Sequence, residues 1–272
     1  MSLRLTIRLH DALSIWMGPG RVRLGRSRAG IAKRRDAPLK YGCSEPAPNV
    51  PLWQPAVYAL EQLLSSNPMR GARATLTLSN HFTRFVVVPA SPVATHGPEQ
   101  RALARTAFSA TYGAAADDWT LSVSPESNGR SMLGAAVDPG LMDAINGICA
   151  AAAVELHSVR PFFAEVFNAS RSVLPEDDFW FAVAERDYVV VAFARSGEWE
   201  LIRARRMTGP IANDLLVLLE QARFVGAIDR PAGNVYLHAA GRASIAFPTE
   251  SPWRIKSLTR TARADRSQEG TS

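Results

Sequence analysis

The chain has 272 residues, of which 47% are hydrophobic, and this is enough to bury a sizeable core in one large domain or two smaller modules. The formal net charge is +6, but ten of the 31 Lys and Arg residues fall within residues 1–40 against two of the 25 acids, so the basic character is local. No apolar run approaches the roughly 18 residues of a membrane-spanning helix, and the N-terminus lacks the apolar segment and cleavage site of a secretory signal, which favours a cytoplasmic protein.

The local basic charge, the cysteines and the histidines carry no recognisable chemistry. A basic arm over residues 1–40 could meet phosphates or an anionic membrane face, and a solvated strand surface explains the same charges equally well. Cys43 and Cys149 match no metal-ligand spacing, so we expect free thiols in a reducing compartment. The histidines show no HxH or HExxH spacing and no GxSxG motif occurs, so we expect no metal site and no catalytic residue.

The first elements in chain order are a strand pair, a loop and a helix. Residues Leu3 to Arg28 alternate apolar and polar side chains around the turn "MGPG", which predicts two strands. Residues 29–51 are rich in Arg, Pro, Gly and Ser without periodicity, and we expect an exposed loop there. Leucines recur on one helical face in residues 52–68, which predicts a helix that ends at Pro68.

The next stretch, "RATLTLSNHFTRFVVVPA", predicts a hairpin over residues 73–90 that turns at Asn80 and His81. The second arm is more continuously apolar than the first, so we expect it to be buried on both faces. A helix is predicted over residues 97–113, and strands over residues 119–125 and 132–137 follow it.

The central and final segments alternate strands and helices. Asp138 and Pro139 predict the start of a helix after a strand, because an Asp caps free amides and a Pro fits the first turn. The predicted order after that point is strand 154–159, helix 162–170, strands 179–185, 188–195 and 199–207, helix 211–224 and strand 234–241. A strand–helix–strand order requires parallel strands covered by a helix. The tail after Pro248 is polar and basic, and we expect residues 259–272 to be disordered.

This order of elements resembles the PilM/GspL-like proteins of type IV pilus and type II secretion assembly platforms. The resemblance is carried by three stretches: "ATLTLSNHFTRFVVVPA", "RSMLGAAVDPGLMDAINGICAAAAVELHSVRPFFAEVFNAS" and "FWFAVAERDYVVVAFARSGEWELIRARRM". It covers roughly residues 70–245. The resemblance implies an α/β protein with the duplicated ribonuclease-H-like fold of actin-like ATPases and an inserted small α/β subdomain.

On this resemblance the chain divides into four parts. Residues 1–69 would hold the strands, basic loop and helix of the first actin-like lobe, and residues 70–175 the inserted subdomain with the rest of that lobe. Residues 176–248 would form the second lobe, and residues 249–272 a basic, disordered tail.

The resemblance raises the question of a nucleotide, because actin-like ATPases hold phosphate between two hairpin turns that carry Asp and Gly. At the first turn we expect Asp-Ile-Gly and find Asp11 followed by Ala12 and Leu13. At the second turn the sequence has Glu185, Arg186 and Asp187, and these side chains would repel or block a triphosphate. We therefore expect no cofactor and no ATP turnover.

In the resembled family, a groove at the inserted subdomain accepts a short extended peptide from the cytoplasmic end of an inner-membrane partner. The implied candidates in this sequence lie beside the predicted hairpin: Arg84, Arg160, Phe162 and Phe163. Core packing is the commoner fate for such phenylalanines.

The sequence thus predicts a non-catalytic cytoplasmic scaffold, peripheral to the inner membrane through its partners, for a pilus or secretion-like assembly platform. Two alternatives remain open: a nucleotide-binding protein or weak ATPase of the same fold, and a nucleic-acid-binding protein that uses the basic N-terminal region. The sequence names neither the partner nor the oligomeric state, and it leaves self-association open.

Overall fold

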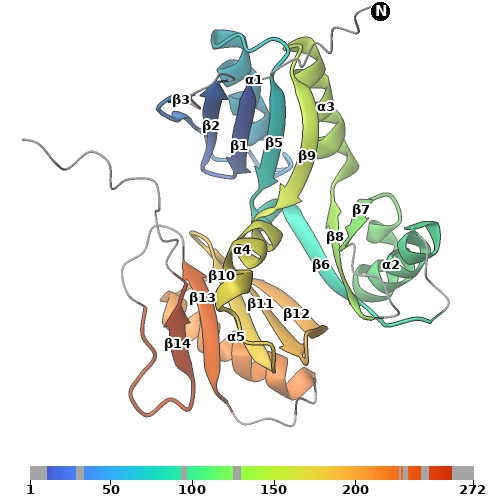
Figure 1. Ribbon diagram of the computed structural model, residues 1–272, viewed down its shortest axis with the longest axis vertical. Helices are drawn as coiled ribbons and strands as arrows, with labels where there is room; N and C mark the ends of the chain where they lie inside the picture. The colour runs from blue at the N-terminus through green and yellow to red at the C-terminus, as the bar shows by residue number, and fades with distance from the viewer. Residues whose placement is uncertain are drawn as a thin grey trace, which may run out of the picture.

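A computed structural model gives the arrangement of the chain, and it describes residues 11–28, 34–92, 97–124, 130–226, 228, 232–239 and 245–258. The described residues form a six-stranded sheet, a five-stranded sheet and a three-stranded sheet (Figure 1). The first sheet has the strand order β3-β2-β1-β5-β9, and β4 also pairs with β2. Its strands are β1 (Ala12–Gly18), β2 (Arg21–Arg28), β3 (Arg34–Arg35), β4 (Leu39–Gly42), β5 (Arg73–Leu78) and β9 (Glu155–Pro161).

The second large sheet repeats the connectivity of the first. Its order is β12-β11-β10-β13-β14, in which β10, β11 and β12 form an antiparallel meander, and β13 and β14 add in parallel. The first sheet likewise pairs β1 with β2 antiparallel and adds β5 and β9 in parallel. These strands are β10 (Phe179–Ala184), β11 (Tyr188–Arg195), β12 (Glu198–Arg206), β13 (Asn234–Ala239) and β14 (Arg254–Ser257). The expected duplication is therefore visible in the topology.

The third sheet, in the order β6-β8-β7, is antiparallel and interrupts the first lobe between β5 and β9. Its strands are β6 (Thr83–Val88), β7 (Thr120–Val123) and β8 (Met132–Val137). The helices are α1 (Gln54–Ser66), α2 (Gly97–Tyr112), α3 (Pro139–Ala151), α4 (Phe162–Ser170) and α5 (Ile211–Val225), with short 3-10 helices η1 (Asn80–Phe82), η2 (Gly113–Ala116) and η3 (Arg171–Val173). The Asp138 side chain accepts a hydrogen bond from the Gly140 amide, so the predicted cap starts α3.

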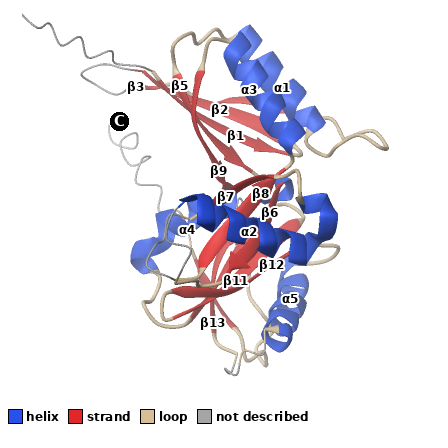
Figure 2. Cartoon of the chain, turned by 90° about the vertical axis from the view of Figure 1, so that its right-hand side faces the viewer, coloured by secondary structure: helices blue, strands red, loops and turns tan. Residues whose placement is uncertain are grey.

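Each sheet buries the face that its helices cover. Helices α1 and α3 lie side by side on one face of the first sheet (Figure 2), where Ile15, Leu60 and Ile145 share one core. Helix α5 covers one face of the second sheet, and α4 with the third sheet packs against the other. Helix α2 covers the outer face of the third sheet, around Phe108. The third sheet thus bridges the two lobes.

The predicted hairpin over residues 73–90 is wrong, although both of its strands exist. Strand β5 pairs with β1 and β9 in the first sheet, whereas β6 pairs with β8 in the third. The 3-10 helix η1 redirects the chain between them. The hydrophobic periodicity of β6 could not predict its partner strand, because both faces of β6 are apolar. Val86 faces α2, while Phe85 packs toward the second lobe.

Two loop predictions also need correction. The expected exposed loop over residues 29–51 contains the short strands β3 and β4, which extend the first sheet. The predicted disordered tail from residue 249 instead contributes β14 to the second sheet, and Trp253 is 1% exposed in its core. The burial of this indole anchors the segment. Residues 259–272, for which disorder was predicted, lie outside the described residues.

Candidate functional site

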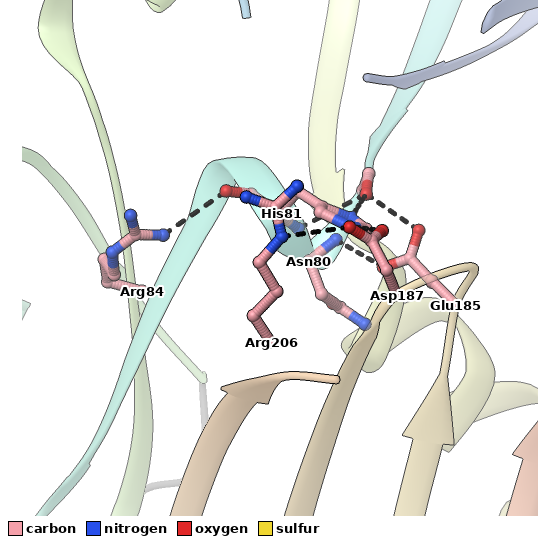
Figure 3. A network of polar contacts seen from close by, with 7 residues as sticks. Asn80, His81, Arg84, Glu185, Asp187 and Arg206 are labelled. Carbon is pink, nitrogen blue, oxygen red and sulfur yellow. Dashed lines mark hydrogen bonds and ion pairs between the residues drawn. The ribbon is translucent and has the colours of Figure 1, made fainter. Parts of the chain in front are cut away.

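A network of buried polar side chains joins the two lobes. One side of it is η1, which follows β5 of the first lobe, and the other is the turn between β10 and β11 of the second lobe (Figure 3). The Ser79 amide donates to the carbonyl of Met17 at 2.8 Å, so η1 is fixed against the end of β1. Ser79 and Asn80 are both 0% exposed, and the contact is therefore shielded from solvent.

Glu185 is the central acceptor of this network. Its Oε2 accepts a hydrogen bond from the Asn80 amide at 2.7 Å, and its Oε1 lies 2.7 Å from the Ser79 hydroxyl oxygen. The side chain comes from the second lobe, and both partners come from the first. Burial raises the pKa of Glu185 to about 7, because desolvation outweighs the two hydrogen bonds that stabilise the carboxylate. The carboxyl therefore titrates near neutral pH.

His81 makes the second link between the lobes. Its Nδ1 lies 2.8 Å from the Ser79 hydroxyl oxygen and its Nε2 lies 2.7 Å from Oδ1 of Asp187. Arg206, at the end of β12, donates to the other oxygen of Asp187 at 3.0 Å. Burial lowers the pKa of His81 even though Asp187 opposes the shift. Burial acts to raise the pKa of Asp187, but the hydrogen bonds and charges of His81 and Arg206 together lower it.

The Ser79 hydroxyl has one proton and lies between two groups that can each accept it. If Glu185 is protonated, it donates to Ser79, Ser79 donates to Nδ1 of His81, and the Nε2–H of His81 donates to Asp187. If Glu185 is ionised, Ser79 donates to it and Nδ1 must carry a proton of its own, which makes His81 an imidazolium. The raised pKa of Glu185 and the lowered pKa of His81 both favour the first arrangement. One proton is thus shared between the lobes through Ser79.

The group Ser79–His81–Asp187 has the residue types of a hydrolytic triad, but its serine lacks the access to solvent that a nucleophile needs. A nucleophile must reach a substrate, whereas the Ser79 side chain is fully buried and already lies against Glu185. These groups hold two parts of the protein together.

Asn80 extends the network to α4. Its Oδ1 accepts a hydrogen bond from the Phe163 amide at 2.9 Å, while Pro161, the residue before α4, offers no side-chain cap of its own. Its Nδ2 is buried and has no hydrogen-bond partner among the described residues. Asn80 therefore caps a helix that is far away in the sequence, while the NH2 group of its side chain has no hydrogen-bond partner among the described residues.

The first nucleotide-loop assignment is wrong. The turn between β1 and β2 spans Gly18 to Arg21, and Asp11 lies at the opposite end of β1, where it forms an ion pair with Arg26. No carboxylate occurs within the sequence "MGPGR" of the turn itself. We predicted the turn at Asp11, just before β1, whereas it begins at Gly18, seven residues further along the chain.

At the second hairpin the predicted turn is confirmed, since Glu185, Arg186 and Asp187 lie between β10 and β11. This turn approaches the first one: Nη1 of Arg186 lies 3.5 Å from the position that a Cβ would take at Gly20. The Asn80 amide, a backbone donor between the lobes, is already bound to Glu185. Two acids, an arginine and an occupied amide do not fit a triphosphate, which needs free backbone amides at close range.

The four predicted partner-binding residues separate into different environments. Phe163 is 0% exposed and packs against Phe85, Phe181 and Trp199, so its expected role as a partner anchor is wrong and it belongs to the core. Phe162 is half-buried, and its ring lies 5.7 Å from that of His238.

The two predicted arginines remain accessible to different degrees. Arg160 is exposed on β9, and Arg84 is half-buried on β6, where it donates to the carbonyls of His81 and Thr83. Arg84 belongs to β6 of the third sheet, Arg160 to the end of β9 in the first lobe, and Phe162 to the start of α4.

Within the described parts of the chain, no group of three or more side chains is arranged to hold a metal ion. Likewise, none of the helices built from described residues combines the length and apolar character needed to cross a bilayer. Cys43 and Cys149 are free thiols, as expected.

No protein-family model matches the chain, and no curated protein matches it. Solved structures do match. The chain is similar to the cytoplasmic domain of EpsL, an inner-membrane component of the type II secretion system of Vibrio cholerae, with a TM-score of 0.56 and 12% identity over 92% of this chain and 90% of that one. It is similar to a chain of the PilM–PilN type IV pilus biogenesis complex, with a TM-score of 0.59 and 14% identity over 85% and 81%.

A third match is a Bacteroides thetaiotaomicron protein of unknown function with an actin-like ATPase fold, with a TM-score of 0.58 and 11% identity over 90% and 87%. At these identities the likeness shows the fold. The chain has the α/β, actin-like ATPase fold that the order of its elements predicted.

The sequence did not reveal the polar network. Ser79, Asn80 and His81 appeared as a turn grouping, and Glu185 and Asp187 as obstacles to phosphate, more than a hundred residues away. The available signal was the fold itself, because the end of β5 and the β10–β11 turn lie on facing lobes once the duplication is recognised. Which of these side chains hydrogen-bond to each other depends on the packing of the two lobes, and the spacing of residues in the sequence does not predict it.

Proposed function

We propose that this protein is a non-catalytic cytoplasmic scaffold that binds the cytoplasmic segments of membrane-anchored components in a type IV pilus or type II secretion-like assembly platform. The proposal is supported by likeness in fold to the EpsL cytoplasmic domain and to the PilM–PilN complex, over more than four fifths of each chain. Its mechanism is binding: the protein presents a fixed surface to a partner and makes no covalent change.

The observation that carries the non-catalytic assignment is the side-chain contact between the lobes. In an ATPase of this fold a nucleotide would link the two lobes. Here Glu185 and Asp187 of the second lobe bind Ser79, Asn80 and His81 of the first directly. Protein groups therefore supply the link, and the lobes need no ligand to remain in register.

The proposed partner site lies where the first lobe meets the third sheet. Arg84 and Arg160 supply cationic groups, and the half-buried ring of Phe162 supplies an apolar surface at the start of α4. Such a surface suits a short extended peptide that joins side-chain anchors with main-chain hydrogen bonds.

The test is a calorimetric titration of the full chain with the cytoplasmic segment of a short single-span membrane protein encoded beside it. We expect saturable binding, and the double variant Arg84→Gln/Phe162→Ala should weaken it about tenfold or more, since truncated anchors typically cost above about 1 kcal/mol each. Phe224→Ala is the matched control, because Phe224 is 87% exposed at the end of α5, away from this junction. Equal affinity in the test variant and in the control would contradict the proposed site, and no binding of any such segment would contradict the function.

The nucleotide-binding alternative predicts heat on titration with Mg-ATP, which the polar network argues against. The nucleic-acid alternative predicts retention on DNA that weakens steeply with salt. Part of the basic charge behind that alternative is already neutralised, since Arg26 pairs with Asp11 and Arg28 with Asp36.

A further inference from the structure

One face of the first sheet has α4 packed at its β5–β9 edge, where the hydroxyl of buried Thr77 hydrogen-bonds Glu165, and it carries polar and charged side chains over β4, β2 and β1. Helices α1 and α3 lie together on the other face, over alternating residues that include Ile15, Leu24 and Leu76. The intervening residues point the opposite way and are polar, aromatic or charged.

The strand register aligns a row of these residues across the sheet. Lys40 on β4 pairs with Arg23 on β2, Arg23 with Trp16 on β1, Trp16 with Thr77 on β5, and Thr77 with Arg160 on β9. Thr77 is buried beneath α4, where its hydroxyl bonds Glu165, so the accessible part of the row runs from Lys40 to Trp16. Neighbouring strands lie about 4.8 Å apart, so this part spans roughly 10 Å. We call Arg21, Arg23, Lys40 and Trp16 the cationic face.

The cations of this face lack neutralising partners. Among the described residues, Arg21, Arg23 and Lys40 take part in no ion pair, whereas Arg73 further along the same sheet is paired with Glu155. The guanidinium groups of Arg21 and Arg23 both lie against the Trp16 ring, at 5.7 and 5.8 Å from its centroid. Nε of Arg23 is buried without a hydrogen-bond partner in the described chain.

Two like charges held on one ring repel each other. Burial lowers the pKa of Arg23, and the positive charge of Arg21 lowers it further. A bound anion would relieve this repulsion and accept hydrogen bonds from the accessible guanidinium N–H groups. The two guanidinium groups and Lys40 therefore make this part of the sheet electrostatically suited to an anionic group.

We propose that the cationic face binds an acidic segment of a partner protein. Carboxylates match guanidinium groups in a bidentate geometry, and about three extended residues cover the 10 Å from Lys40 to Trp16 at roughly 3.3 Å per residue. This surface is separate from the proposed partner site, and it holds or fails whether or not the protein serves a pilus or secretion platform.

The chemistry of the face favours a peptide over a membrane or a nucleic acid. The Trp16 ring is half-buried beneath two guanidinium groups, so it can neither insert into a bilayer interface nor stack on a base. Lipid headgroups and DNA become outcomes of the test.

The experiment measures binding of fluorescein-labelled hexaglutamate to the full chain by fluorescence anisotropy at low salt. We expect saturable binding that weakens toward about 0.15 M salt, and a loss of affinity of about tenfold in Arg21→Gln/Arg23→Gln. The matched control is Arg70→Gln/Arg101→Gln, which removes the same charge from two other exposed arginines and should change affinity less than about twofold.

A second, single variant distinguishes a loss of binding from misfolding of the double variant. Lys40→Gln changes one exposed side chain, and we expect it to fold normally and to weaken binding about twofold to threefold. Equal losses in the test and control double variants would overturn the proposal, as would no binding of hexaglutamate. Stronger competition by duplex DNA or by phosphatidylglycerol vesicles than by hexaglutamate would overturn it too. Arg160 is left intact throughout, so that the result is independent of the proposed partner site.

Discussion

Glu185 is the residue on which the contact between the lobes depends most. It is 6% exposed, yet it carries a carboxyl group whose two oxygens meet donors from the other lobe. A buried carboxyl is costly when ionised, and this cost raises its pKa to about 7. His81, at the other end of the shared proton, is shifted in the opposite direction by the same burial.

The pH dependence of stability follows from the sign of the Glu185 shift. Because its pKa in the folded protein lies near 7 and above its ordinary value of 4.5, its contribution is fully present below pH 4.5 and is lost as the pH rises to about 7. The loss amounts to about 3 kcal/mol of unfolding free energy. His81 acts in the opposite sense over the upper part of this range, because its lowered pKa makes its contribution complete only above 6.5.

Glu185→Gln isolates the carboxyl contribution, since Gln imitates the protonated acid. We expect the variant to be more stable than the wild type at pH 8 and about equal to it at pH 5, in urea unfolding followed at several pH values. Asp187, whose pKa is lowered, does not titrate in this window. The same dependence on pH in both proteins would refute the buried-acid assignment.

At the scale of elements, the short helix η1 has three separate roles. It ends β5, redirects the chain into the third sheet, and caps α4 through Asn80. Helix α4 follows β9 directly, and its first turn has no capping side chain nearby in the sequence. The position of α4 on the second lobe therefore depends on a side chain from the first.

Asn80→Ala should weaken α4 selectively. We expect a loss of about 1–2 kcal/mol in unfolding free energy, typical for a helix cap, and faster hydrogen exchange of the amides in residues 162–170 than in α1. Asn67→Ala is the control, because Asn67 also binds a helix terminus, through its Nδ2 and the carbonyl of Leu63, but only within its own lobe. Unchanged exchange in α4 would show that Asn80 does not hold it.

At the scale of the whole molecule, local patterns predicted the elements and not all of their partners. The Asp138–Pro139 cap and the meander of β10, β11 and β12 depend on neighbours in the sequence, and both were predicted. The hairpin over residues 73–90 was wrong because strand pairing across sheets is set by distant segments. Strand β14 was missed because four residues in a basic stretch carry too little periodicity.

The same distinction holds for the site. The residues of the β10–β11 turn were located from the fold resemblance and interpreted as obstacles to a phosphate. The structure shows that two of them, Glu185 and Asp187, also bind side chains and backbone of the first lobe. Asp11 was misplaced by one strand length, and Phe163 proved to be core. The network of Ser79, His81 and Glu185 joins positions more than a hundred residues apart, so only the packing of the lobes brings it together.

The central claim is that side chains, and not a nucleotide, join the two lobes, and titration of the full chain with Mg-ATP in a calorimeter tests it most directly. The account predicts no saturable heat up to about millimolar nucleotide. A dissociation constant of about 1 mM would correspond to a binding free energy of only about 4 kcal/mol. Saturable binding with a micromolar dissociation constant, unchanged in Arg21→Gln/Arg23→Gln, would contradict it, because a triphosphate would then occupy the space assigned to Glu185 and Arg186.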